Sequence, residues 1–270
     1  MTLKYIFKNC FLLLSVLIFV NCSAQKNTNK AVMPIAVTSF GSRQIIVVVT
    51  PTATAQSGLL RAYEWSASKA WQPLTNWTKV KLGRNGMAWG AGLQQENIMD
   101  TMRKKEGDGK APQGIFRVTH AFGYAEKPNP KWRIPYLNAS SNLLCIDDSK
   151  SKYYNQILTK KAQQDWDSAE QMRREDGLYE YGLLVDYNKL MVAQTPETAA
   201  TKQGGSCIFM HIQKLNDLPT AGCTAMSRTD IVGLIGVLDA TKKPILIQAT
   251  NENYTKMMKI YGLPNILITK

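Results

Sequence analysis

Residues 204–226 read GGSCIFMHIQKLNDLPTAGCTAM, and this stretch says most about how the chain folds. The run Cys207–Ile212 predicts a buried strand, because it is short, apolar and bounded by glycines and polar residues. A polar loop follows, and the chain then reaches Gly222 and Cys223. Glycine allows a sharp change of backbone direction, so the stretch predicts a strand, a loop and a tight turn.

Short strands also dominate the rest of the chain. The clearest is Arg43–Thr50 (RQIIVVVT), a β-branched run that ends at Pro51. The other predicted strands are Leu60–Trp65, Trp77–Leu82, Gly114–Thr119, Gly182–Tyr187 and Pro244–Gln248. They do not alternate with helices in the manner of a parallel α/β sheet, which favours a mainly β fold.

Helical patterns are few. Ser227–Leu238 has apolar residues at helical spacing, and either Ser227 or Thr229 can cap it. Asp165–Glu175 places acids early and arginines late, as the helix dipole favours, and Ser149–Leu158 is a third candidate helix. We therefore predict one mainly β or α+β domain with a few helices over residues 41–250, followed by a tail at 251–270.

The first 24 residues predict a secretory signal. Their apolar core, Phe11–Val20, follows two lysines and is too short to span a bilayer. Cleavage after Ala24 by ordinary signal peptidase is one possibility, and a lipoprotein signal that leaves Cys22 as the lipidated first residue is the other. Polar residues 25–40 then form a tether. We expect an exported protein of the cell envelope, either periplasmic or anchored to the membrane by a lipid.

The formal net charge of +13 bears on the choice of partners. In an exported protein it favours anionic envelope polymers or lipid headgroups, and a merely well-solvated basic surface is the alternative. The sequence has no basic stretch with interleaved aromatic residues, which is the pattern that would indicate nucleic-acid binding. The sequence also has no metal-ligand cluster or phosphate-binding loop, so we expect no metal and no cofactor.

Cys223 and His211 are the candidate catalytic residues. A cysteine directly after Gly222 sits where the backbone turns sharply, and amide N–H groups at that turn could form an oxyanion hole. His211 lies one loop earlier and can approach the thiol as its base, and the chain has only two histidines. The alternative is that Cys223 is a small buried apolar residue and His211 a hydrogen-bonded residue at the end of a strand.

The same stretch resembles the active-site signature of the L,D-transpeptidase catalytic domain (YkuD-like) family, in which a histidine and a loop precede a Gly-Cys nucleophile. It is most similar to a subfamily with a TAGCTAM-type motif. Typical members carry a second histidine directly before the glycine, where this chain has Ala221. Further similarities follow the family's order along residues 43–248, at Lys105–Phe116, Phe122–Tyr124, Cys145–Asp148, Tyr154-Asn155, Trp166–Met172 and Val185–Asn188.

This resemblance implies a β-sandwich catalytic domain that transfers acyl groups of peptidoglycan stem peptides through a thioester on Cys223. His211 would handle the protons, oriented by a backbone carbonyl such as that of Ile212. The amides of Gly222 and Cys223 would hold the oxyanion. Substrate contacts are expected at Thr220, Ala221, Thr224 and Ile212.

Several reactions remain open on this fold. A second stem amine would resolve the thioester and form a crosslink, whereas water would make the enzyme an L,D-carboxypeptidase. An amidase or hydrolase of another acyl peptide is a further alternative. A catalytically silent, wall-binding lipoprotein is the alternative from a different class.

The remaining candidate residues have structural interpretations. Cys145 and Cys207 lie in predicted strands, and in an oxidising compartment they either form a disulfide or stay buried as free thiols. We interpret His120 as a surface or packing residue. Asp147-Asp148 are interpreted as helix-capping acids rather than a catalytic carboxylate pair. A tight turn, or alternatively a wall of the cleft, is expected at Lys105, Gly107 and Asp108.

Overall fold

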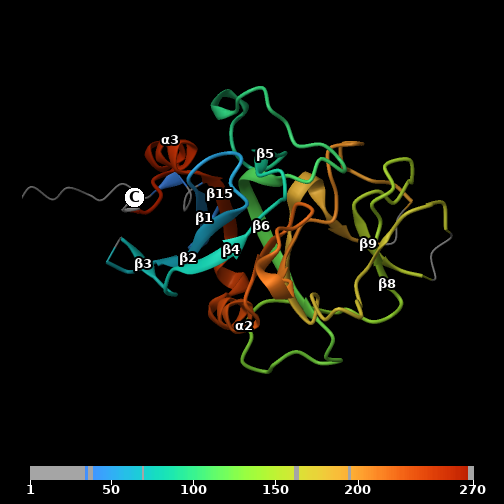
Figure 1. Cartoon of the computed structure of the whole chain (residues 1–270). Coiled ribbons are helices and arrows are strands. Elements are labelled where there is room, and N and C mark those ends of the chain that lie inside the picture. The colour runs from blue at the N-terminus through green and yellow to red at the C-terminus, as the bar shows by residue number, and fades with distance from the viewer. Residues whose placement is uncertain (1–33, 36–38, 69, 161–163, 194–195, 267–270) are drawn as a thin grey trace, which may run out of the picture. The chain divides into compact units, whose positions relative to one another are not determined.

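The main 11-stranded sheet closes on itself in the computed structural model, which describes residues 34–266 apart from 36–38, 69, 161–163 and 194–195 (Figure 1). In order around the circuit its strands are β1 (Gln44–Thr50), β15 (Ile245–Thr250), β6 (Ala111–Gly123), β11 (Tyr181–Val185), β13 (Phe209–Ile212), β14 (Thr224–Met226), β4 (Thr78–Lys81) and β2 (Ser57–Trp65). The circuit is completed by antiparallel pairing of β1 with β2. At its margins β3 (Trp71–Pro73) pairs with β2, while β5 (Met87–Trp89) and β7 (Tyr136–Asn138) pair with β6.

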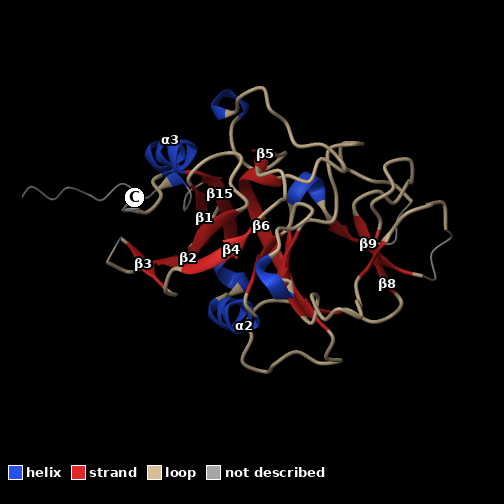
Figure 2. Ribbon diagram, in the orientation of Figure 1, coloured by secondary structure: helices blue, strands red, loops and turns tan. Residues whose placement is uncertain are grey.

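The prediction of a mainly β domain is confirmed, and Figure 2 shows how strongly strands prevail over helices. Each predicted strand overlaps an observed one. The expected sandwich takes the form of one continuous sheet, because hydrogen bonding runs without a break around the circuit. Closure leaves fewer unpaired backbone groups at sheet edges than two separate sheets would.

Strand β1 is apolar from residue 45 to residue 49 because both of its faces are buried. Ile46 and Val48 pack into one core cluster with Phe116 and Leu246. The alternate residues, among them Val47, pack into a second cluster on the other face. Side chains of a strand point alternately to opposite faces, so a strand covered on both sides reads as an unbroken hydrophobic run.

Within the described residues, two α-helices cover the sheet. Helix α2 (Arg228–Val237) is capped by Ser227, one of the two candidate caps, whose side chain accepts a hydrogen bond from the Asp230 N–H. Helix α3 (Asn251–Tyr261) lies within residues 251–270, where the sequence predicts only a tail, and it packs on β15 and β1 (Figure 1). Short 3-10 helices lie at Glu96–Ile98, Tyr187–Lys189, Leu215–Asp217 and Ala240–Lys242.

A second sheet of four strands forms the part of the molecule around the β8 and β9 labels in Figure 1. Its strands are β10 (Glu170–Gln171), β8 (Leu143–Cys145), β9 (Gln156–Thr159) and β12 (Met191–Val192). This sheet replaces two predicted helices, Ser149–Leu158 and Asp165–Glu175, and both predictions are wrong. Asn155 has a left-handed φ of 59°, which a helix does not accommodate. The Asp165 carboxylate accepts hydrogen bonds from Ser151 and Lys152 instead of capping a helix.

Candidate active site

Neighbouring parallel strands bring His211 and Cys223 to one cavity. His211 on β13 pairs with Ala225 on β14, and Cys223 directly precedes β14. Residues two apart in a strand share a face, so Cys223 and Ala225 point the same way. Both line a cavity of about 600 Å³ together with His211. Both candidate groups are buried, with 8% of Cys223 and 6% of His211 exposed.

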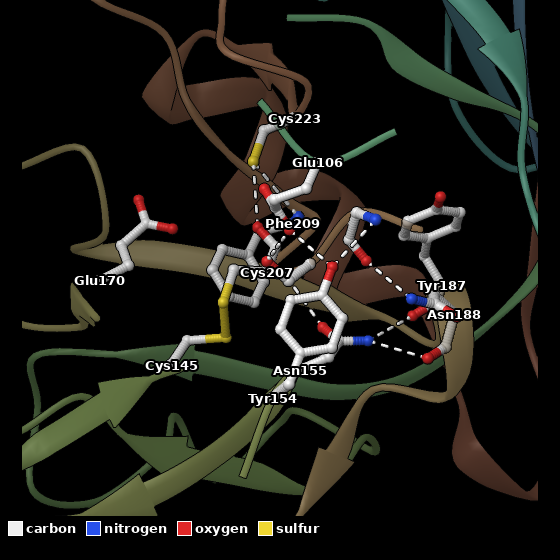
Figure 3. Close-up of a disulfide and its surroundings, with 12 residues drawn as sticks. Glu106, Cys145, Tyr154, Asn155, Glu170, Tyr187, Asn188, Cys207, Phe209 and Cys223 are labelled. Atoms are coloured by element: carbon white, nitrogen blue, oxygen red, sulfur yellow. Dashed lines mark hydrogen bonds between the residues drawn. A yellow bond between two sulfur atoms is a disulfide. The ribbon is translucent and has the colours of Figure 1, made fainter. Parts of the chain in front are cut away.

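The sulfur of Cys223 lies between a backbone donor and a backbone acceptor (Figure 3). The Phe209 N–H donates to Sγ at 3.4 Å, and Sγ–H donates to the Cys207 carbonyl at 3.6 Å. Burial raises the pKa of the Cys223 thiol to about 12, and the charge of Glu170 raises it further, whereas the Phe209 N–H and the Lys104 cation lower it. The resting residue is therefore a neutral thiol.

Thr220 and Gly222 shape the turn before the cysteine. The Thr220 hydroxyl donates to the Cys223 carbonyl at 2.7 Å and accepts from the Gly222 N–H at 3.0 Å. Gly222 has a φ of +153°, and a Cβ there would lie 2.9 Å from the Lys110 carbonyl oxygen. The turn therefore needs glycine both for its backbone conformation and for the space beside it.

His211 is held in one tautomer. Its Nδ1 lies 2.7 Å from the Ile212 carbonyl oxygen, the partner expected from the resemblance. Since a carbonyl only accepts, Nδ1 carries the hydrogen and Nε2 keeps its lone pair. The Tyr179 ring packs edge-on against the imidazole, with ring centroids 5.1 Å apart. Burial lowers the pKa of His211 to about 4, so the ring is neutral at neutral pH.

A disulfide joins the second sheet to the strand that carries His211. Cys145, the last residue of β8, is bonded to Cys207, which lies just before β13 (Figure 3). Asn155 fixes the same place, because its side-chain oxygen accepts the Cys207 N–H at 2.9 Å. The Cys207 carbonyl accepts the hydrogen bond of the Cys223 thiol. Cys207 is thus held in place by both the disulfide and the hydrogen bond to Asn155.

A comparison with known protein families matches residues 46–247 to the L,D-transpeptidase catalytic domain. The match covers more than half of the 270 residues and includes both His211 and Cys223. The chain belongs to this family. A comparison with curated proteins finds no match. Membership indicates an L,D-transpeptidase-type enzyme, whose family acts on peptidoglycan.

The residues expected to form the site of this L,D-transpeptidase domain fall into two groups, those that line the cavity and those that point to the opposite face. Cys223, His211, Gly222, Thr220 and Ala221 all line the cavity. Thr224 and Ile212 do not, which corrects the expectation that they contact substrate. Each follows a cavity-facing residue in its strand, so its side chain points to the other face. There the Thr224 hydroxyl bonds to Gln248, and Ile212 packs against the core.

The expected oxyanion hole also needs a correction. The Gly222 N–H, one of its two predicted donors, already donates to the Thr220 hydroxyl. A donor engaged in the resting turn cannot serve an oxyanion without breaking that bond. The sequence motif alone could not reveal this, because a hydrogen bond between the Thr220 hydroxyl and the Gly222 amide depends on the conformation of the turn.

Charged residues on the cavity wall were missed from the sequence. Lys104, Arg174 and Glu170 all line the cavity, and the Glu170 carboxylate accepts a hydrogen bond from Tyr179 at 2.5 Å. Burial raises the pKa of Glu170 to about 7. These residues come from loops and a two-residue strand, so no periodic pattern in the sequence points to them.

The other interpreted residues have definite places. The Asp108 carboxylate accepts from the Lys105 and Lys110 N–H groups, which makes the expected tight turn, and Gly107 of that turn lines the cavity. Asp148 accepts from the Lys150 and Asp167 N–H groups.

Asp147 and His120 complete this set. Asp147 lines the cavity, and no helix follows it, so the helix-capping interpretation of Asp147-Asp148 is wrong. His120 is half-buried in β6, where burial lowers its pKa, as a packing role implies.

The predicted signal and lipidation site lie outside the described residues. So do residues 25–33 of the predicted tether. Among the described residues, no helix is long and apolar enough to cross a membrane. The same residues contain no group of histidine, cysteine or acidic side chains suited to hold a metal ion.

Proposed function

We propose that this protein acts on peptidoglycan stem peptides by acyl transfer, with Cys223 as the nucleophile and His211 as its base. One observation carries the proposal: the family match includes a histidine on β13 and a cysteine directly before the paired strand β14, and both line one cavity. The tautomer of His211 supports it, since the free Nε2 can accept a proton. The surrounding cavity has room for a peptide segment.

The reaction starts from a neutral pair. The Cys223 sulfur attacks the carbonyl that joins the third and fourth stem residues, and the thiol proton passes to Nε2 of His211. The carbonyl electron pair moves to oxygen and returns when the C–N bond breaks. The leaving D-alanine takes the proton from His211, and a thioester remains. The amine of a second stem then attacks the thioester and gives a crosslink, while the thiol is restored.

The acyl acceptor decides between two activities. A stem amine gives the L,D-transpeptidase, and water gives an L,D-carboxypeptidase. Ala221 is relevant here because it is exposed at the cavity, at a position where typical members of the family carry a histidine. The small methyl group leaves this side of the cavity more open. We assign crosslinking as the main activity and hydrolysis as the competing outcome.

We further propose that the protein is exported, with Cys22 as a lipid-anchored first residue. The sequence features of residues 1–24 support export, and a disulfide between Cys145 and Cys207 is typical of an oxidising compartment. In the producing cell, the Cys22→Ser variant should move from the membrane fraction to the soluble periplasmic fraction. An unchanged membrane fraction would contradict lipidation.

The reaction is tested by incubating the protein with tetrapeptide-stem muropeptides and following intact protein and products by mass spectrometry. The expected result is an acyl adduct on Cys223 followed by crosslinked dimers. Cys223→Ala should form neither, and His211→Gln should slow adduct formation by about 10²–10⁴-fold. Tripeptide products without dimers would identify the carboxypeptidase. Absence of any adduct or product would contradict the proposed catalysis and favour the wall-binding alternative.

A further inference from the structure

A buried lysine lies beside the turn that carries the candidate nucleophile. Lys104 precedes β6 in a loop, and only 4% of its side chain is exposed. It lines the same cavity as Cys223. Its Nζ donates to the Asp108 carboxylate at 2.9 Å and to the Lys105 carbonyl at 3.3 Å. Lysine is rarely buried, so its position needs a reason beyond the fold of one loop.

The side chain of Lys104 passes between two glycines. A Cβ on Gly205 would lie 3.0 Å from Cε of the lysine. A Cβ on Gly222 would lie 3.6 Å from its Nζ. The stem therefore runs close along the Gly205 backbone, and the ammonium group ends next to the residue that precedes Cys223. A Cβ at Gly205 would crowd this path, whereas one at Gly222 would be in ordinary contact with the ammonium group.

The oxyanion of the proposed reaction lacks one of its expected donors. The Gly222 N–H is engaged with Thr220, which leaves the Cys223 N–H from the predicted pair. An ammonium group has three N–H donors, and two of those of Lys104 have partners in the turn around Asp108. The third can serve a new acceptor. The charge of Lys104 already acts on this centre, since it lowers the pKa of the Cys223 thiol.

We propose that Lys104 is a catalytic residue, whose ammonium group donates to the oxyanion formed when Cys223 attacks the stem carbonyl. This inference rests on the proposed function. As the S–C bond forms, the carbonyl π pair moves to oxygen, and the lysine N–H and the Cys223 N–H hold that oxygen. When the pair returns and the C–N bond breaks, the hydrogen bond relaxes. Lys104 keeps its protons throughout, and His211 supplies the one that the leaving amine needs.

A purely structural role for Lys104 makes a different prediction. If the lysine only fastened the turn through Asp108, its loss would lower stability and leave kcat for acyl-adduct formation unchanged in the protein that remains folded. A catalytic ammonium group lowers the transition state instead, so its loss reduces kcat and leaves KM nearly unchanged. It also stabilises negative charge at Cys223, which the pH dependence of thiol alkylation reports without any substrate.

The test compares Lys104→Met with Lys104→Arg and with Lys105→Met in the full chain. Lys105 is the exposed neighbour, so its variant removes the same charge from the same loop. Because Lys104→Met leaves the Asp108 carboxylate without its ion-pair partner, the double variant with Asp108→Asn provides a folded alternative. Circular dichroism selects variants that remain folded. Acyl-adduct formation with tetrapeptide-stem muropeptides and iodoacetamide alkylation of Cys223 are then measured.

Loss of the Lys104 charge should slow adduct formation by about 10²–10³-fold, with KM changed much less. Alkylation between about pH 7 and 10 should slow at each pH, because less thiolate is present. Lys104→Arg should recover part of both rates, and Lys105→Met should match the wild type. Folded Lys104 variants that acylate at the wild-type rate would overturn the proposal.

Failure of the proposed function is recognised separately. In that case the wild-type protein forms no adduct with any stem peptide, while alkylation of Cys223 can still be measured. An unchanged alkylation profile in the folded Lys104 variants would then overturn the role of the lysine. Slower alkylation would support its electrostatic action on Cys223.

Discussion

Burial sets the protonation state of the residues around the cavity. It raises the pKa of Cys223 and Glu170 and lowers that of His211, in each case because a charge loses its hydration. At neutral pH the candidate pair is therefore a thiol and a neutral imidazole, and the proton moves only during attack. This arrangement differs from a preformed thiolate–imidazolium pair, which a strongly exposed or cation-rich site would favour.

His211 and Glu170 should make opposite contributions to acid stability. The pKa of His211 falls to about 4 on folding, so its contribution is lost as pH decreases from about 6.5 through 4. The pKa of Glu170 rises to about 7, so its contribution is lost as pH increases from about 4.5 through 7. Each of the two shifts changes the free energy of unfolding by on the order of 3 kcal/mol once the pH has passed both pKa values of the group. Between about pH 4.5 and 6.5, the His211 contribution increases with pH while the Glu170 contribution decreases.

Two variants separate these contributions in urea unfolding across that pH range. Glu170→Gln should lose more stability than the wild type on acidification, since of these two groups only His211 still titrates. His211→Gln should instead gain stability relative to the wild type as the pH falls towards about 4.5. Parallel pH profiles for the two variants would contradict the burial of both groups.

At the scale of elements, strands were predicted better than helices. The strand β1 is apolar on both faces, and its sequence leaves no helical pattern to compete. The predicted helix Asp165–Glu175 failed because its polar side chains bond to distant segments, as Asp165 does with Ser151. Helix α3 was missed although Tyr254, Met257 and Tyr261 recur at helical spacing and face the core. Its C-terminal Gly262, with a φ of 64°, is a further helix signal.

Met257 tests whether α3 is an integral part of the domain. The residue is fully buried in the cluster on the outer face of β1 and β15. Met257→Ala should reduce the free energy of unfolding by about 2–5 kcal/mol, because it leaves a cavity under the helix. The exposed Lys259→Ala on the same helix should change it by less than about 0.5 kcal/mol. Equal midpoints of chemical unfolding for the two variants would show that α3 is dispensable.

At the scale of the whole molecule, the second sheet and the closed sheet build the cavity together. Glu170 comes from β10 of the second sheet, while His211 comes from β13 of the closed sheet. The Cys145–Cys207 disulfide joins these parts across 62 residues of sequence. Removal of the disulfide raises the conformational entropy of the unfolded chain. It also loosens the segment around Cys207, whose carbonyl accepts a hydrogen bond from the Cys223 thiol.

Reduction of the disulfide should therefore affect both stability and the site. A loop of this length corresponds to about 4 kcal/mol of stabilisation, so Cys145→Ser with Cys207→Ser should lower the unfolding midpoint clearly. Adduct formation on Cys223 should also slow in the folded variant. Thiol titration of a denatured, unreduced chain starting at Gln25 should find one free thiol, and three would contradict the pairing.

The sequence by itself determined the β-rich class, the family, and the residue types at the Gly222-Cys223 turn. Those features depend on local pattern and on a short contiguous motif. The tertiary structure alone decided that Thr224 and Ile212 face away from the cavity, that Thr220 occupies the Gly222 amide, and that Lys104 reaches the turn. The face of each side chain depends on strand register, and charged walls are assembled from loops distant in sequence, so neither can be obtained from residue order alone.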